Sequence, residues 1–186
     1  MSMAALVPRY TAAEVRAFPD DRVRYEVIRG ELFVTPAPRR PHQRAVIEFA
    51  IRLHTYVTTH QLGETLPAPF EVEFAEDSAV QPDVLVLLDR DTPRITEERL
   101  YGPPALVIEI VSHSSRRTDR LQKRELYQGF RVPEYWIVDI DQRRVERWQP
   151  GTTSAEIITA TLAWRPDPKL PPLEIDLPSL FAFVNR

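Results

Sequence analysis

The sequence contains no cysteine at all. This absence excludes disulfide bonds, thiolate zinc sites and a cysteine nucleophile, and it is typical of a reducing compartment. No apolar run approaches the roughly 20 residues needed to span a bilayer. The N-terminal segment MSMAALVPRY is too short and too weakly apolar for a signal peptide. We therefore expect a cytoplasmic protein with no membrane partner.

The sequence also lacks an excess of positive charge, because its 24 Lys and Arg are outnumbered by 27 Asp and Glu, which gives a formal net charge of −3. The molecule as a whole is not a polycation, so any binding of nucleic acid has to come from a local basic patch. The 186 residues suit one domain with a sizeable core. The hydrophobic fraction of 43% and the charged fraction of 27% are ordinary for a globular protein.

Strand and helix patterns follow one another along the chain and indicate one domain of mixed α/β class over residues 1–186. The first two strands are predicted by RVRYEVIRGELFVTP, in which Gly30 can supply the positive φ of a hairpin turn. A long helix comes next, with Pro41 in its first turn and Gly63 as the stop signal after it. His42 lies on the apolar face of this helix. Near the C-terminus, EIITATLAW predicts one strand.

Two continuous apolar segments, PDVLVLLD and ALVIEIVS, are typical of central strands of a sheet. Asp83 opens the first segment, and Glu109 lies in the middle of the second. An ionised carboxylate in a buried strand must be paired or bound to a cation, because bare burial is too costly. If the two strands are neighbours, both carboxylates converge at one edge of the sheet. Such a pair suits Mg²⁺, which can polarise a phosphodiester and lower the pKa of an attacking water.

A further helix is predicted by TDRLQKRELYQGF. Asp119 and Lys123 are four residues apart, so they share a face, and that apolar face continues into Leu126, Tyr127 and Phe130. We therefore expect Lys123 to point inward toward Glu109, where an ammonium can orient water or stabilise developing charge. Four arginines around the start of this helix form a candidate surface for a phosphate backbone: Arg116, Arg117, Arg120 and Arg124.

Each of these residues also has a plain structural interpretation. Glu109 and Lys123 can form a buried ion pair that serves only the fold. Asp83 can cap a turn, and His42 can be an ordinary core histidine. The arginine cluster can be a solvated helix face. Residue spacing alone leaves these alternatives open.

Three stretches, YEVIRGELFVTPAPRRPHQRAV, QPDVLVL and ALVIEIVSHSSRRTDRLQKRELYQGFRVPEYWIVD, resemble a large bacterial family of restriction-endonuclease-like proteins. This family belongs to the PD-(D/E)XK nuclease superfamily, and the resemblance runs from Tyr25 to Asp139. It implies a restriction-endonuclease-like core, which is a mixed central sheet flanked by helices.

The resemblance also implies a set of site residues. Asp83 and Glu109 match the two acidic members of the family motif and would be ligands of Mg²⁺ or Mn²⁺. The usual lysine, two residues after the second acid, is replaced here by Val111. Lys123 in the following helix is the matching lysine, and His42 matches a histidine at the start of the first long helix. Asp119 would support the site.

The family resemblance points to a Mg²⁺-dependent nuclease that hydrolyses DNA, and homodimers are common in the superfamily. One alternative is a catalytically inert binding module that keeps Asp83, Glu109 and Lys123 as a structural polar network. Another is a different phosphoryl-transfer enzyme or metal-dependent hydrolase on the same core. His113 stands where relatives read S-P-S-T, so the loop above the site departs from the family pattern and gains a titratable group.

Overall fold

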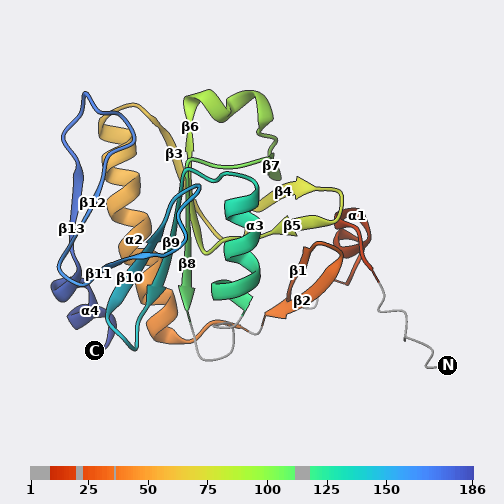
Figure 1. The fold of residues 1–186 in the computed structure, drawn as a ribbon, viewed down its shortest axis with the longest axis horizontal. Coiled ribbons are helices and arrows are strands. Elements are labelled where there is room, and N and C mark those ends of the chain that lie inside the picture. Colours follow the sequence, from red (N-terminus) through yellow and green to blue (C-terminus); the bar gives the residue numbers. More distant parts are fainter. Residues whose placement is uncertain (1–8, 20–22, 36, 112–117) are drawn as a thin grey trace.

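The computed structural model describes residues 9–19, 23–35, 37–111 and 118–186, except for the side chains of residues 92–93 and 118–120. Within these ranges the chain forms layers (Figure 1). A central sheet is covered on one face by the long helix α2 and on the other by α3 and a second sheet. The expected mixed α/β architecture is confirmed.

The central sheet has six strands in the order β11-β10-β9-β8-β6-β3. β8 and β9 run parallel, whereas the other neighbouring pairs run antiparallel, so the sheet is mixed as expected. Its strands are β3 (Gly63–Pro67), β6 (Val84–Leu88), β8 (Leu106–Val111), β9 (Glu134–Asp139), β10 (Arg144–Trp148) and β11 (Glu156–Ile158).

The second sheet has five strands in the order β2-β1-β5-β4-β7. Its first two strands form the predicted hairpin, and the turn residues Arg29 and Gly30 have φ values of 50° and 80°. Positive φ at both turn positions is the geometry that matches the twist of the flanking strands. The strands are β1 (Arg24–Ile28), β2 (Glu31–Thr35), β4 (Glu71–Ala75), β5 (Ser78–Val80) and β7 (Arg99–Tyr101).

The helices differ widely in length. The α-helices are α1 (Ala12–Arg16), α2 (Arg40–Thr59), α3 (Arg124–Gly129) and α4 (Leu177–Val184). A 3-10 helix η1 (Asp89–Arg94) follows β6, and a π-helical segment η2 (Thr118–Lys123) leads directly into α3. None of the helices in the described part of the chain is both long enough and apolar enough to cross a membrane.

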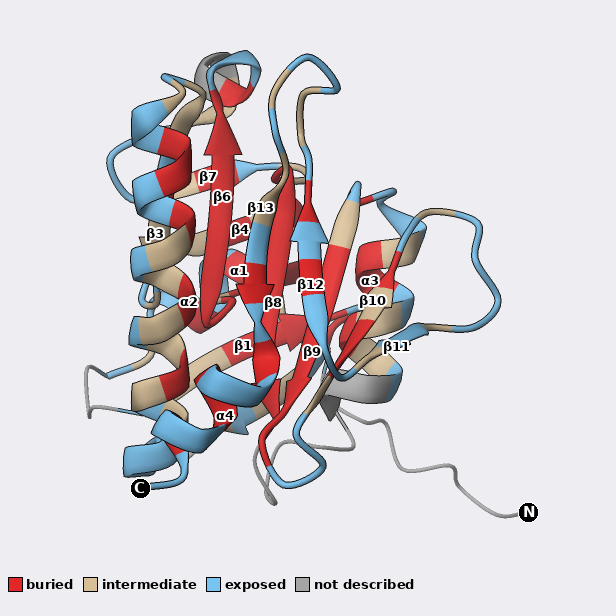
Figure 2. Ribbon diagram, turned by 90° about the vertical axis from the view of Figure 1, so that its left-hand side faces the viewer, coloured by how far each residue is buried: buried red, intermediate tan, exposed pale blue. Residues whose placement is uncertain are grey.

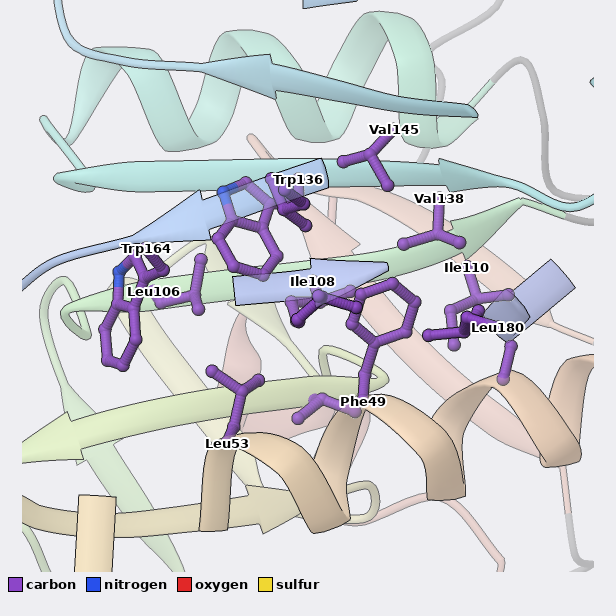
Figure 3. Close-up of a cluster of buried hydrophobic side chains, with 14 of the residues drawn as sticks. Phe49, Leu53, Leu106, Ile108, Ile110, Trp136, Val138, Val145, Trp164 and Leu180 are labelled. Atoms are coloured by element: carbon purple, nitrogen blue, oxygen red, sulfur yellow. The ribbon is translucent and has the colours of Figure 1, made fainter. Parts of the chain in front are cut away.

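One face of the central sheet carries the larger apolar core. Phe49 and Leu53 of α2 pack against the central strands and reach Trp136 (Figure 3). The far side of this core is closed by α4 and by the strand pair β12 (Thr161–Trp164) and β13 (Leu173–Asp176), which contribute Trp164 and Leu180. Figure 2 shows the buried residues of α2 facing the sheet and its exposed residues facing away.

The opposite face of the sheet packs on α3 and the second sheet. Leu126 and Tyr127 of α3 belong to this core, together with Ile28 of β1 and Phe74 of β4. The short helix α1 covers the outer side of the second sheet through Ala12 and Val15. Because β1 and α3 both meet the central sheet on this face, polar side chains from all three elements can converge there.

Two expectations about the chain path are wrong. The segment EIITATLAW is not one strand, because a bend at residues 159–160 sends β11 to the central sheet and β12 to its partner β13. The helix α2 ends at Thr59 without help from Gly63, and the positive φ after it falls on Gln61 at 51°. Gly63 instead lies in β3 with φ +142°, where a Cβ atom would stand 2.2 Å from the Leu87 carbonyl oxygen.

This close approach makes Gly63 a test of the fold. We expect Gly63→Ala to lower the free energy of unfolding by roughly 2–4 kcal/mol, because β3 would have to move away from β6. Gly129→Ala is the matched control, since a Cβ atom there would meet nothing within 4 Å and the residue is helical. The control is expected to be stabilised by up to about 1 kcal/mol. Equal denaturation midpoints for the two variants would contradict this role of Gly63.

Candidate active site

The two predicted carboxylates lie on neighbouring strands. β6 and β8 pair antiparallel with Val84 opposite Ile108, so Asp83 falls beside Glu109 at the start of β6. The backbone N–H of Ile110 donates to Asp83 Oδ2 at 2.8 Å. The Asp83 side chain therefore continues the hydrogen-bond ladder beyond the end of β6, which is a structural role of its own.

Asp83 is buried and is held from both sides of the sheet edge. His42 Nε2, from the first turn of α2, lies 3.0 Å from Asp83 Oδ2. Arg24 Nη1, from β1, donates to Asp83 Oδ1 at 3.1 Å. His42 Nδ1 is buried and has no hydrogen-bond partner in the described structure. His42 is therefore in the predicted site, and Arg24 joins it.

Glu109 is buried in the middle of β8 and meets two donors from the η2–α3 segment. Lys123 Nζ donates to Glu109 Oε1 at 2.9 Å, and the Tyr127 hydroxyl donates to the same oxygen at 2.7 Å. The expectation that Lys123 points inward toward Glu109 is confirmed. The sequence predicts Tyr127 only as part of the apolar face, and Phe130, predicted on the same face, is exposed instead.

Lys123 also binds a carboxylate of the second sheet. Its Nζ atom lies 3.0 Å from Glu26 Oε1, and both side chains are buried. Glu26 Oε1 in turn accepts the Gln81 backbone N–H at 2.7 Å, while Arg24 Nη1 donates to the Gln81 carbonyl at 3.1 Å. Gln81 connects β5 to β6, so Arg24 and Glu26 fix the point where the chain passes from one sheet to the other.

Lys123 lies at the point where the π-helical segment η2 passes into α3. The last residue of η2 is Lys123, and α3 begins with the next residue. A π-helical turn is wider than an α-turn and is frequent at functional sites. Lys123 and Tyr127 remain four residues apart across the change of helix type, so both reach Glu109.

The remaining predicted residues are less defined. The backbone of Asp119 and Arg120 lies in η2, but their side chains lie outside the described structure, as do Arg116, Arg117 and His113 entirely. The guanidinium of Arg124 lies over the Trp148 ring, with Cζ 4.9 Å from the ring centroid. Nucleic-acid binding by these arginines stays a prediction.

The sequence shows the family to which this chain belongs. A family model described as "Putative restriction endonuclease" (Uma2) matches residues 12–178 of the chain. The chain belongs to this family. The resemblance seen in the strand and helix motifs is therefore confirmed, and no match occurs among curated proteins.

A solved structure supports the fold of this Uma2-family chain. It is described as the crystal structure of a putative nuclease belonging to DUF820 from Anabaena variabilis ATCC 29413. The TM-score is 0.79 and the sequence identity 18%, and the match covers 94% of this chain and 99% of the other. At this identity the likeness shows the shared fold alone, and the chemistry depends on the residues of the site.

The electrostatics of the Uma2-family site keep Asp83 ionised. Burial alone would raise the pKa of Asp83, but the hydrogen bond and charge of His42, together with the charges of Arg24 and Lys123, lower it to about 2. Burial similarly opposes the charge of Arg24, yet the Asp83, Glu26 and Glu109 carboxylates raise its pKa. Burial and the neighbouring Glu109 raise the pKa of Tyr127 well above its usual value, so its hydroxyl stays protonated.

Sequence reasoning missed Glu26, Arg24 and Tyr127. Glu26 and Arg24 are two residues apart on β1 and share one face of that strand. A signal was present, because Glu26 stands between Tyr25 and Val27 much as Glu109 stands in its own strand. The sequence did not indicate that Lys123 is the partner of Glu26, because the two residues are far apart along the chain.

A hard divalent cation prefers carboxylate oxygens, which the predicted ligands Asp83 and Glu109 offer, as does Glu26. In the described residues, no group of three or more histidine, aspartate or glutamate side chains is arranged to hold a metal ion. Mg²⁺ usually takes only one or two protein carboxylates and completes its shell with water and substrate phosphate. The donor chemistry of Asp83 and Glu109 therefore fits Mg²⁺ or Mn²⁺.

The lowered pKa of Asp83 predicts a specific dependence of stability on pH. A carboxyl with a folded-state pKa of about 2 against a usual 3.8 stabilises the fold above pH 4. That contribution, about 2 kcal/mol, is lost as the pH falls through 2. We expect the difference in unfolding free energy between wild type and Asp83→Asn to shrink by this amount between pH 5 and pH 2, measured by chemical denaturation in EDTA. A difference that does not change with pH would contradict the lowered pKa.

A second prediction concerns the lysine shared by two carboxylates. Lys123→Met leaves Glu26 and Glu109 without their common cation and should lower the unfolding free energy by roughly 3–5 kcal/mol. Adding Glu26→Gln removes one of the two negative charges and should restore at least about 1 kcal/mol. Lys169→Met, at an exposed lysine, is the control and should change stability by less than about 0.5 kcal/mol. Strictly additive losses in the double variant would show that the two side chains are not coupled.

Proposed function

We propose that this Uma2-family protein is a divalent-metal-dependent nuclease that hydrolyses phosphodiester bonds of DNA. The observation that carries the proposal is the register of β6 and β8, which puts two buried acidic residues, Asp83 just before β6 and Glu109 in β8, opposite one another. Membership of a restriction-endonuclease family supports the same chemistry. DNA as the substrate follows from the family and from the acid, acid and lysine set.

Asp83 and Glu109 would hold Mg²⁺ or Mn²⁺. When bound, such a cation polarises a phosphodiester and lowers the pKa of a coordinated water. The protein's own residues prepare the site for it: His42 and the Ile110 N–H orient Asp83, and Lys123 with Tyr127 orients Glu109. Asp119 and the four arginines of the helix start are proposed as supporting and DNA-binding residues on sequence grounds alone.

Lys123 has a narrower role in this proposal than the sequence predicted. Its ammonium is buried between Glu26 and Glu109, at 3.0 and 2.9 Å. In that position it fixes the orientation of Glu109 and lowers the cost of gathering several carboxylates in a dry interior. We therefore propose Lys123 as a positioning residue for Glu109.

A second candidate function has an observation in its favour. The described cations Arg24 and Lys123 already pair with Asp83, Glu26 and Glu109, so two of the three carboxylate charges are neutralised without any metal. A catalytically inert module of the same fold, serving as a binding partner, would use the same network purely for stability. The family match, the fold and the network are compatible with both candidates, and activity separates them.

The decisive experiment is plasmid nicking by the purified full-length chain with Mg²⁺, with Mn²⁺ and with EDTA. We expect nicking only with a divalent cation. Asp83→Asn and Glu109→Gln should each lower the rate at least about 10²-fold, because each removes one of the two negative charges that would hold the cation. Calorimetric titration with Mn²⁺ should show weakened metal binding in the same two variants.

Glu125→Gln is the matched control. Glu125 lies on α3 beside this site in sequence, but its side chain is exposed and pairs with Arg29 on the surface. The control is expected to nick DNA at the wild-type rate. A wild type that binds no divalent cation and cleaves neither plasmid nor single-stranded DNA would favour the inert module. The homodimer expected for the superfamily is a separate prediction, to be checked by light scattering.

A further inference from the structure

Within the described residues, two cations lie among the carboxylates of this site, and their surroundings differ. Lys123 is 3% exposed, and its ammonium is already shared by Glu26 and Glu109. Arg24 is 20% exposed, although one of its nitrogens reaches the buried Asp83 carboxylate. A substrate approaches from solvent, so the exposed fraction decides which cation it can meet.

The hydrogen bonds of Arg24 leave much of its guanidinium unused. Its hydrogen bonds to Asp83 Oδ1 and to the Gln81 carbonyl both come from Nη1, at 3.1 Å. Nε and Nη2 make no hydrogen bond within the described residues, and neither is among the buried atoms that lack a partner. These two nitrogens therefore meet solvent, and they are the pair that forms the forked donor edge of a guanidinium.

Arg24 is also held in place. Nη1 binds Asp83 and the carbonyl of Gln81, where the chain passes from one sheet to the other. The strand that carries Arg24, β1, is fixed by its pairing with β2 and β5. A side chain anchored through one nitrogen, with its fork facing outward, loses little conformational freedom when it binds a ligand. A carboxylate or a phosphate matches this fork. The site already holds ionised carboxylates, and the proposed function gives it a cation and a nucleic acid to bind, so the phosphate is the ligand that fits.

From this geometry we infer that Arg24 is a catalytic residue of the proposed nuclease, which contacts the scissile phosphate through Nε and Nη2. The inference rests on the proposed function and adds the group that faces the substrate. Arg24 and Lys123 then divide two tasks: Lys123 orders the buried carboxylates, and Arg24 binds the phosphate at the solvent side.

The expected action of Arg24 is electrostatic. In hydrolysis a water oxygen forms a bond to phosphorus while one ester P–O bond breaks. The water's proton passes to solvent, and the leaving alkoxide takes a proton from solvent. Negative charge grows on the non-bridging phosphate oxygens, and a guanidinium fixed beside them stabilises that charge. Arg24 takes no part in the proton transfers.

The test uses full-length Arg24→Gln and Arg24→Lys, with Arg29→Gln as control. Arg29 belongs to the same hairpin but is 61% exposed and pairs with the surface residue Glu125. Binding of a short duplex DNA is measured against salt concentration in Ca²⁺, and turnover is measured in Mg²⁺. Mn²⁺ affinity is measured by calorimetry without DNA.

We expect Arg24→Gln to turn over roughly 10²–10³-fold more slowly and to reduce the slope of log affinity against log salt by about 1, the signature of one lost phosphate contact. Its Mn²⁺ affinity should be equal or higher, because a positive charge near Asp83 is gone. Arg24→Lys keeps the charge but not the fork, so its salt slope should stay near wild type while its rate falls at least about 10-fold. Arg24→Lys also keeps the inference testable if Arg24→Gln does not fold.

Several outcomes would overturn the inference. An unchanged salt slope in Arg24→Gln would show that Arg24 makes no phosphate contact. A loss of Mn²⁺ affinity with unchanged turnover at saturating metal would show that Arg24 only supports Asp83. The salt slope is read from binding alone, so it tests the contact even if the wild type cleaves no DNA. A wild type that cleaves no DNA would instead overturn the proposed function.

Discussion

A buried lysine that is shared by two carboxylates joins the two sheets of this protein, because neither carboxylate can be left unpaired in the interior. Glu26 belongs to the second sheet and Glu109 to the central sheet, and Lys123 binds both of them. Because an uncompensated buried charge costs several kcal/mol, neither carboxylate can be buried until the lysine is in place. The packing of α3, which carries Tyr127 onto Glu109, and the path of the chain at Gln81, which binds Glu26, are both tied to this bridge.

Much of the central sheet could be predicted from sequence because its signals are local. Continuous apolar runs predicted β6 and β8, and the i to i+4 spacing predicted the inward direction of Lys123. The adjacency of Asp83 and Glu109 followed from the same two strands. A family motif then connected these residues to a metal site, although their role in catalysis is a matter of proposal.

The other half of the network could not be read from the sequence, for a physical reason. The partners of Glu26 and Arg24 lie in other sheets and helices, and no residue spacing reports a contact between distant segments. The same limit applies to β11 and β12, which look like one strand until two different partners divide them. The role of Gly63 was missed because it depends on the approach of a neighbouring backbone, which no pattern of side chains records.

The bridge between Glu26 and Lys123 also bears on how the chain folds. The two residues are separated by 123 − 26 = 97 positions, and Arg24 and Asp83 by 83 − 24 = 59. Contacts of such long range form slowly, because a large loop has to close before they contribute any stability. The carboxylate cluster therefore assembles as the two sheets dock, and not before. A nascent or partly unfolded chain lacks the cluster, so whatever chemistry it performs is confined to molecules that have completed folding.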